Sequence, residues 1–209
     1  LAALEDRSHP AWQRLKAEEL LAQQLSQQQS RRARDQLSAP VIPSGGGAPG
    51  LPPLHEQLLA ALPFGLTAAQ HRVGEEIAHD LARARPMHRL LQGDVGSGKT
   101  VVSALAACLA IEAGWQCALM APTEILAEQH FKKIISWLEP FGVRVVWLSG
   151  KQKAKEKREA LAAIEDGAEL VVGTHAIIQP DVKFKALGLA IVDEQHRFGV
   201  QQRHKLNEK

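Results

Sequence analysis

The sequence predicts an α/β fold in which a parallel sheet is covered by helices on both faces. From Met87 onward, short apolar runs alternate with segments of helical periodicity. Continuous apolar strands joined by helical crossovers are typical of parallel sheets buried on both sides. Strands are expected near residues 88–92, 116–121, 143–148, 169–173 and 187–192, with helices near 99–113, 123–139 and 152–166. Ligands of such sheets bind at the carboxyl ends of the strands.

The chain upstream of the sheet divides into three segments. Residues 1–38 predict one long helix, with Ser8 as a possible cap and a narrow apolar face that must lie against another surface. Residues 39–53 contain repeated Pro and Gly, which break regular structure, so we expect a flexible loop and a domain boundary there. A short helix near 54–61 and a helix entered at Thr67 then open the domain that runs to residue 209.

Composition sets broad limits on the class of protein. The chain has 209 residues, 45% of them hydrophobic and 23% charged, which suits a globular domain with an extension. The net charge of +2 neither requires nor excludes nucleic acid, so any basic surface must be local. Cys108 and Cys117 lie in apolar surroundings without metal or redox spacing and are expected to be reduced core residues of an intracellular protein. The sequence starts at Leu1, so we expect it to be part of a longer polypeptide.

A glycine-rich segment carries the first candidate site. In RLLQGDVGSGKTVVSALAACLA, residues 89–110, two spaced glycines are closed by Lys and Thr between a strand candidate and a helix. The first N–H groups of that helix lack internal partners and, with the helix dipole, favour a phosphate. The segment consists of Gly93, Asp94, Val95, Gly96, Ser97, Gly98, Lys99 and Thr100. Lys99 would place an ammonium on the outer phosphates and Thr100 a hydroxyl on Mg²⁺, whereas the simpler alternative is a turn with a solvated lysine.

Two adjacent carboxylates follow the last predicted strand. In LGLAIVDEQHRFG, Asp193 and Glu194 come at the edge where the glycine segment also lies. Asp193 could hold Mg²⁺ opposite Thr100, and Glu194 could orient or deprotonate an attacking water. The alternative is a solvated strand end, where Asp and Glu are common. The glycine segment favours the functional interpretation.

Four motifs together resemble a known family. GDVGSGKT, APTEILAEQH, VVGTHAIIQ and DEQHRFGVQQR, in this order, are similar to the first motor lobe of superfamily 2 helicases, and specifically of the RecG branched-DNA helicases. LPFGLTAAQ resembles the nucleotide-side segment of that family, and HPAWQRLKAEELLAQQLS resembles the helix that joins its wedge domain to the motor. A transcription-repair coupling translocase shares GDVG-GKT and RFGV but differs in the acidic motif. The resemblance implies a RecA-like P-loop lobe over residues 54–209.

The resemblance also implies ATP and Mg²⁺ as cofactors and assigns further residues to them. Lys99, Thr100, Asp193 and Glu194 take the roles given above. Gln70 resembles a glutamine that reads adenine, although Thr67 and Gln70 also fit a capping box. Phe64 could lie against the base or be buried. His196 resembles a residue that couples the nucleotide site to DNA, or it is simply a hydrogen-bonded neighbour.

Candidate DNA contacts lie in three places. The resemblance places Thr123 of APTE and Thr174 of GTH along a strand-carrying groove, although both could be helix N-caps. The run KQKAKEKRE, residues 151–159, contains Lys153, Lys155 and Lys157, which would attract DNA or form a solvated helix face. Phe198 and Arg203 could also contact nucleic acid.

The predicted function is an ATP-dependent motor that remodels branched DNA, such as forks and Holliday junctions, in repair and recombination. The alternatives are a P-loop enzyme of another class, such as a small-molecule kinase, and a nucleotide-binding module without turnover. The expected partners are branched DNA and the missing wedge domain and second lobe of the same polypeptide, without which turnover should be poor. The resemblance implies a monomer of the bacterial cytoplasm that acts at the nucleoid and does not bind membranes.

Overall fold

The computed structural model describes residues 10–45, 50–94 and 96–194. Contacts divide the chain into two compact units. The first unit comprises Leu1–Pro40 and Ala84–Pro86, and the second comprises Val41–Arg83 and Met87–Lys209. The sheet and the candidate site both belong to the second unit.

The first unit consists mainly of helix α2, Pro10–Asp35. The predicted long helix is therefore confirmed. Pro10 is its first residue, a position whose backbone N–H forms no hydrogen bond within the helix, so proline is tolerated there. The leucine side chains of the helix are exposed, namely those of Leu15, Leu20, Leu21 and Leu25. Along the described part of the chain, none of the helices combines the length and apolarity that a membrane span requires.

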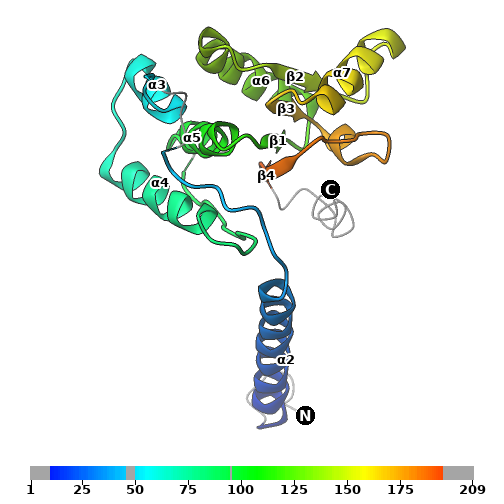
Figure 1. Ribbon diagram of the computed structural model, residues 1–209. Coiled ribbons are helices and arrows are strands. Elements are labelled where there is room, and N and C mark those ends of the chain that lie inside the picture. Colours follow the sequence, from blue (N-terminus) through cyan, green and yellow to red (C-terminus); the bar gives the residue numbers. More distant parts are fainter. Residues whose placement is uncertain (1–9, 46–49, 95, 195–209) are drawn as a thin grey trace. The chain divides into compact units, whose positions relative to one another are not determined.

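A four-stranded parallel sheet forms the centre of the second unit. Its strands are β1 (Gln116–Met120), β2 (Val145–Leu148), β3 (Leu170–Gly173) and β4 (Leu187–Val192), in the order β2-β3-β1-β4 (Figure 1). All three pairings are parallel. The carboxyl ends of all four strands therefore lie at the same edge of the sheet. The parallel arrangement expected from the apolar runs is confirmed for these four strands.

Helices cover both faces of the sheet, which makes three layers. Helices α5 (Lys99–Glu112) and α6 (Glu124–Leu138) share one core cluster with Cys117 and Leu119 of β1. Helix α7 (Ala154–Asp166) shares the cluster on the other face with Ala118 and Met120. Alternate residues of β1 thus enter opposite cores, and the predicted α/β fold is confirmed.

Two more helices lie outside α5. Helices α3 (Leu54–Ala61) and α4 (Ala68–Leu81) contribute Leu58, Ile77 and Leu81 to the α5 cluster and lie beside α5 in Figure 1. Short 3-10 helices η1 (Glu139–Phe141) and η2 (His175–Ile178) complete the unit. Cys108 and Cys117 are free and fully buried, as predicted, and burial raises the pKa of both thiols.

The prediction of a strand at residues 88–92 was wrong, because the structure assigns no strand there. Leu90 is 66% exposed, whereas a central strand would bury it. The Arg89 guanidinium instead forms ion pairs with Glu76 and Asp80 of helix α4. These carboxylates raise the pKa of Arg89, Asp80 most strongly. Side-chain ion pairs with α4 therefore hold this segment.

Candidate functional site

The glycine loop, residues 93–98, leads directly into helix α5. Gly96 and Gly98 have φ values of 85° and 81°, in the left-handed region that glycine adopts without strain. Gly98 is the N-cap of α5, where no side chain forms a capping hydrogen bond and the first turn contains no acidic residue. The start of α5 therefore presents backbone N–H groups without a competing carboxylate, which favours an anion.

Lys99 folds back over the loop that precedes it. Its Nζ donates to the carbonyl oxygens of Gly93 and Asp94, at 2.6 and 2.9 Å. An ammonium has three N–H donors, so one remains for a ligand. Thr100, the next residue of α5, is half-buried. The pair predicted to hold phosphate and Mg²⁺ thus lies in the first turn of the helix.

Gln70 joins helix α4 to the glycine loop. The capping box predicted from TAAQ is confirmed, since Thr67 N–H donates to Gln70 Oε1 and Gln70 N–H donates to Thr67 Oγ1. Gln70 Nε2 also donates to the Ser97 carbonyl, at 2.9 Å. A Cβ at Gly98 would collide with this amide, which is a second reason for glycine there. The amide keeps one N–H and one acceptor lone pair for another partner.

Phe64 is exposed rather than buried. Its relative exposure is 48%, in the short segment between helices α3 and α4. The alternative of a buried Phe64 was therefore wrong. An exposed ring before the α4 cap is available for stacking.

Asp193 follows strand β4 at the carboxyl edge of the sheet. Its N–H donates to the Met120 carbonyl at the end of β1. Its Oδ2 lies 2.7 Å from His130 Nε2, and its Oδ1 accepts the Glu194 N–H at 3.0 Å. The hydrogen bond from His130, more than any other contact, holds the pKa of Asp193 below its usual value, and the charge of Lys99 acts in the same direction. The carboxylate is therefore ionised at neutral pH.

Glu194 has an unusual backbone conformation. Its φ of 47° is the one positive value among the described non-glycine residues. A left-handed residue after a strand turns the chain sharply. The strained position lies at a predicted functional residue, as such conformations often do.

Sequence reasoning missed His130. It lies on α6, two turns after Thr123, within the motif APTEILAEQH that had been interpreted only for nucleic acid. The available signal was the predicted topology, because α6 starts at the carboxyl edge where β4 also ends. Periodicity could not show that this side chain reaches a residue 63 positions away.

The two threonines assigned to DNA have different environments. Thr123 is the N-cap of α6 and its Oγ1 accepts the Leu126 N–H, as the capping alternative predicts. Thr174 is 2% exposed and its side chain forms no capping bond. Its hydroxyl has no hydrogen-bond partner in the part of the chain that the structure describes. In this conformation Thr174 Oγ1 is closed to a ligand.

The basic run carries less free charge than its sequence suggests. Lys151 pairs with Glu124 of the APTE motif at 2.8 Å, and this contact chiefly lowers the pKa of Glu124. Lys157 pairs with Asp181 at 2.8 Å, whereas Lys155 is 82% exposed and lies 3.9 Å from Glu159. Lys153 is exposed at the start of α7. Lys153 and Lys155 therefore offer more to a phosphate backbone than Lys157 does.

Several predicted residues lie outside the described part of the chain. They are Val95 of the glycine loop and His196, Phe198 and Arg203 after the acidic pair. Among the described residues no cluster of three or more His, Cys, Asp or Glu side chains could hold a metal ion.

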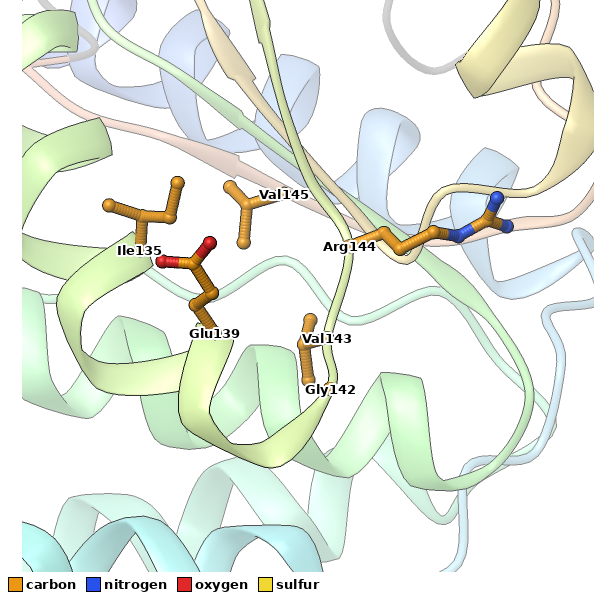
Figure 2. A pocket seen from close by; sticks show the side chains of 6 residues that line it. All are labelled: Ile135, Glu139, Gly142, Val143, Arg144 and Val145. Atoms are coloured by element: carbon orange, nitrogen blue, oxygen red, sulfur yellow. The ribbon is translucent and has the colours of Figure 1, made fainter.

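A shallow pocket of about 360 Å³ lies at the opposite edge of the sheet. Ile135, Glu139 and residues 142–145 line it, just before strand β2 begins. Figure 2 shows the Arg144 side chain extending away from Ile135 and Glu139. Its guanidinium pairs with Asp166 and lies near Glu169. The pocket therefore belongs to the amino edge, away from the strand ends that carry Asp193.

The parallel sheet, the glycine loop before α5 and the acidic end of β4 define a RecA-like P-loop lobe. A family model described as DEAD/DEAH box helicase matches residues 67–209, more than half of the sequence. The chain belongs to the DEAD/DEAH box helicase family.

Known proteins extend the match beyond that model. The chain is 52% identical to the ATP-dependent DNA helicase RecG of Haemophilus influenzae and 51% identical to that of Escherichia coli K12, over its whole length in both cases. It spans 29% of the length of each. The RecG resemblance is thereby confirmed for the 209 residues.

Solved helicase structures have a similar fold. A structure of RecG bound to a three-way DNA junction matches 90% of this chain and 25% of its own, with a TM-score of 0.78 and 45% identity. The UvsW helicase of bacteriophage T4 matches 78% of this chain and 57% of its own, with a TM-score of 0.55 and 18% identity. That second likeness shows the fold alone.

Proposed function

We propose that this chain is the ATP-binding first lobe of a RecG-type motor that remodels branched DNA. The observation that carries the proposal is the glycine loop at the start of α5, together with Asp193 at the carboxyl edge of the sheet, in a chain about half identical to RecG helicases. Forks and junctions are the expected DNA, by analogy with the RecG structure bound to a three-way junction.

The phosphates of ATP would bind at the start of α5. The backbone N–H groups of the first turn and the helix dipole attract anions, and Lys99 adds a positive charge. Its remaining N–H can donate to an outer phosphate while the carbonyls of Gly93 and Asp94 hold the other two. Gln70 would read the adenine edge with its remaining donor and acceptor, and Phe64 would lie against the base.

The residues present fit Mg²⁺ together with a nucleotide. The Thr100 hydroxyl and the Asp193 carboxylate are oxygen donors, which Mg²⁺ prefers, and it is commonly held by one or two carboxylates with substrate phosphates. The absence of a larger ligand cluster among the described residues agrees with this arrangement. When bound, the ion would neutralise charge on the phosphates.

Glu194 would orient the attacking water and accept its proton. The residue lies next to Asp193, and its backbone adopts the left-handed region, with a φ of 47°. A general base must lie within hydrogen-bond reach of the proton that it takes, and such backbone conformations are common at functional sites. The DNA would run past the start of α6 and of α7, where Thr123, Lys153 and Lys155 lie.

Lys99→Ala tests this proposal. Isothermal titration of Mg-ADP into the 209-residue chain should show at least a tenfold weaker affinity, because the variant loses the charge that meets the phosphates. Lys132→Ala is the matched control, since Lys132 is exposed on α6 and pairs with Glu128, one turn earlier on the same helix. Circular dichroism melts check the fold. Equal affinity of Lys99→Ala and the unaltered chain would contradict the proposal.

A further inference from the structure

His130 links helix α6 to the acid at the end of strand β4. Its Nε2 lies 2.7 Å from Asp193 Oδ2, and the two side chains are 17% and 29% exposed. The contact joins two elements that are 63 residues apart in the sequence. The carboxylate proposed to meet a metal ion is therefore bound by a side chain of α6, a helix that does not follow the glycine loop.

The direction of this hydrogen bond follows from the charge of the carboxylate. An aspartate carboxyl group is ionised at neutral pH, and an ionised carboxylate can only accept hydrogen bonds. His130 Nε2 must therefore carry the proton and donate. The other oxygen, Oδ1, accepts the Glu194 N–H. With one donor on each oxygen, the plane of the carboxylate is fixed, while other lone pairs stay open.

Packing of α6 does not depend on His130. The helix is anchored in the core by Ala127, Ile134 and Leu138, each at most 1% exposed. His130 is only partly buried, and its side chain contacts Asp193. Removal of the imidazole should thus alter the carboxylate more than the fold.

We propose that His130 is a positioning residue that orients the Asp193 carboxylate for the Mg²⁺ of a bound nucleotide. The proposal rests on the proposed function, because it assumes that Asp193 meets that ion. Hydrogen bonds that orient a metal-binding carboxylate typically change metal affinity by about 10- to 100-fold when they are lost. His130 acts through Asp193 and touches neither the nucleotide nor the reacting atoms.

The test compares ADP affinity with Mg²⁺ and with EDTA in the 209-residue chain. The ratio of the two affinities isolates the contribution of the ion. His130→Leu keeps side-chain volume but removes the donor, and we expect it to lower this ratio about tenfold, with affinity in EDTA unchanged. His130→Gln supplies an amide N–H and should recover part of the ratio. His79→Leu, at an exposed histidine on α4, is the control and should leave the ratio unaltered.

The possible results separate the two proposals. If His130→Leu keeps the normal affinity ratio while Lys99→Ala still binds Mg-ADP weakly, the role of His130 is overturned and the proposed function stands. A similar loss in Mg²⁺ and in EDTA also overturns it, because a general structural defect explains that result. Equal loss in His130→Leu and His130→Gln overturns the hydrogen-bond assignment. If the unaltered chain gains no affinity from Mg²⁺, both the proposed function and this proposal fail.

Discussion

Gln70 Nε2 donates a hydrogen bond of 2.9 Å to the Ser97 carbonyl, across 27 residues of sequence. The same side chain accepts the Thr67 N–H through Oε1 at 2.8 Å. One amide therefore caps helix α4 and holds the glycine loop. The capping box and the predicted nucleotide role are thus compatible, because the amide keeps one N–H and one acceptor lone pair after both contacts.

Gln70→Glu separates these two tasks. A carboxylate still accepts the Thr67 N–H, but it cannot donate to Ser97 and it repels the carbonyl. We expect Mg-ADP affinity to fall about five- to tenfold, as for a lost hydrogen bond of roughly 1 kcal/mol, with little change in melting temperature. Gln70→Ala should lower both, because it also removes the side-chain half of the capping box, the acceptor of the Thr67 N–H. Unchanged affinity in Gln70→Glu would show that the loop does not need this bond.

The lysines after β2 should contribute unequally to DNA binding. Lys153 and Lys155 are exposed, whereas Lys157 is paired with Asp181. The Lys153→Gln, Lys155→Gln double variant should reduce the slope of log K against log salt by up to about 1.4 for single strands, since each lost phosphate contact removes about 0.7. Lys157→Gln should change it less. Fluorescence anisotropy over a salt series measures the slopes.

Glu124→Gln should have the opposite effect to the lysine variants, because it frees a positive charge instead of removing one. It removes the carboxylate that pairs with Lys151 at 2.8 Å and leaves that ammonium free for phosphate. DNA affinity should then rise and its salt slope steepen. If every variant in this run has the slope of the unaltered chain, the run is a solvated helix face and DNA binds elsewhere.

Most of the fold could be predicted because local patterns and tertiary packing agree. The apolar runs at β1 and β3 are fully buried and those at β2 and β4 are partly buried, and the helix starts expected at Thr67 and near residue 99 are real. Residues 88–92 were misjudged because a short apolar run does not reveal its pairing partners. Arg89 within that run finds two carboxylates on α4, a tertiary interaction that periodicity does not encode.

The candidate site was predictable only where neighbours in sequence act together. The glycine loop, Lys99 and Thr100 form one local unit, and Asp193 with Glu194 forms another. His130 and the Gln70–Ser97 bond depend on contacts between distant elements. The Thr174 hydroxyl is buried and Lys157 is paired with Asp181. Both facts depend on residues outside the GTH and KQKAKEKRE motifs, so the motifs alone could not predict them.

Gly173 at the end of β3 should not tolerate a side chain. It pairs with Leu148 of β2, and a Cβ at Gly173 would collide with the Leu148 carbonyl oxygen. Gly173→Ala must therefore displace the backbone, and we expect a loss of roughly 3 kcal/mol in the free energy of unfolding. Gly150→Ala is the control, since nothing lies within 4 Å of a Cβ there. Urea unfolding compares the two, and equal stability would refute this steric reason.

Turnover by the 209-residue polypeptide alone should be slow even where it binds nucleotide. The RecG relatives are more than three times as long, since the chain spans 29% of their length. The resemblance implies that a second lobe brings arginine to the γ-phosphate, and such an arginine contributes on the order of a thousandfold or more in rate. A single lobe also leaves the nucleotide open to water, so a water held by Glu194 would be poorly oriented.

Steady-state phosphate release, with and without forked DNA, measures this rate. Forked DNA should add little, because stimulation requires DNA to close one lobe on the other. Glu194→Gln serves as the control for contaminating ATPases, since it removes the proposed base while keeping the side-chain shape. Fast release that rises on forked DNA and disappears in Glu194→Gln would mean that this lobe contains every group that hydrolysis needs. The arginine would then have to come from the chain itself, and Arg197 and Arg203, beyond the described residues, would be the first to replace.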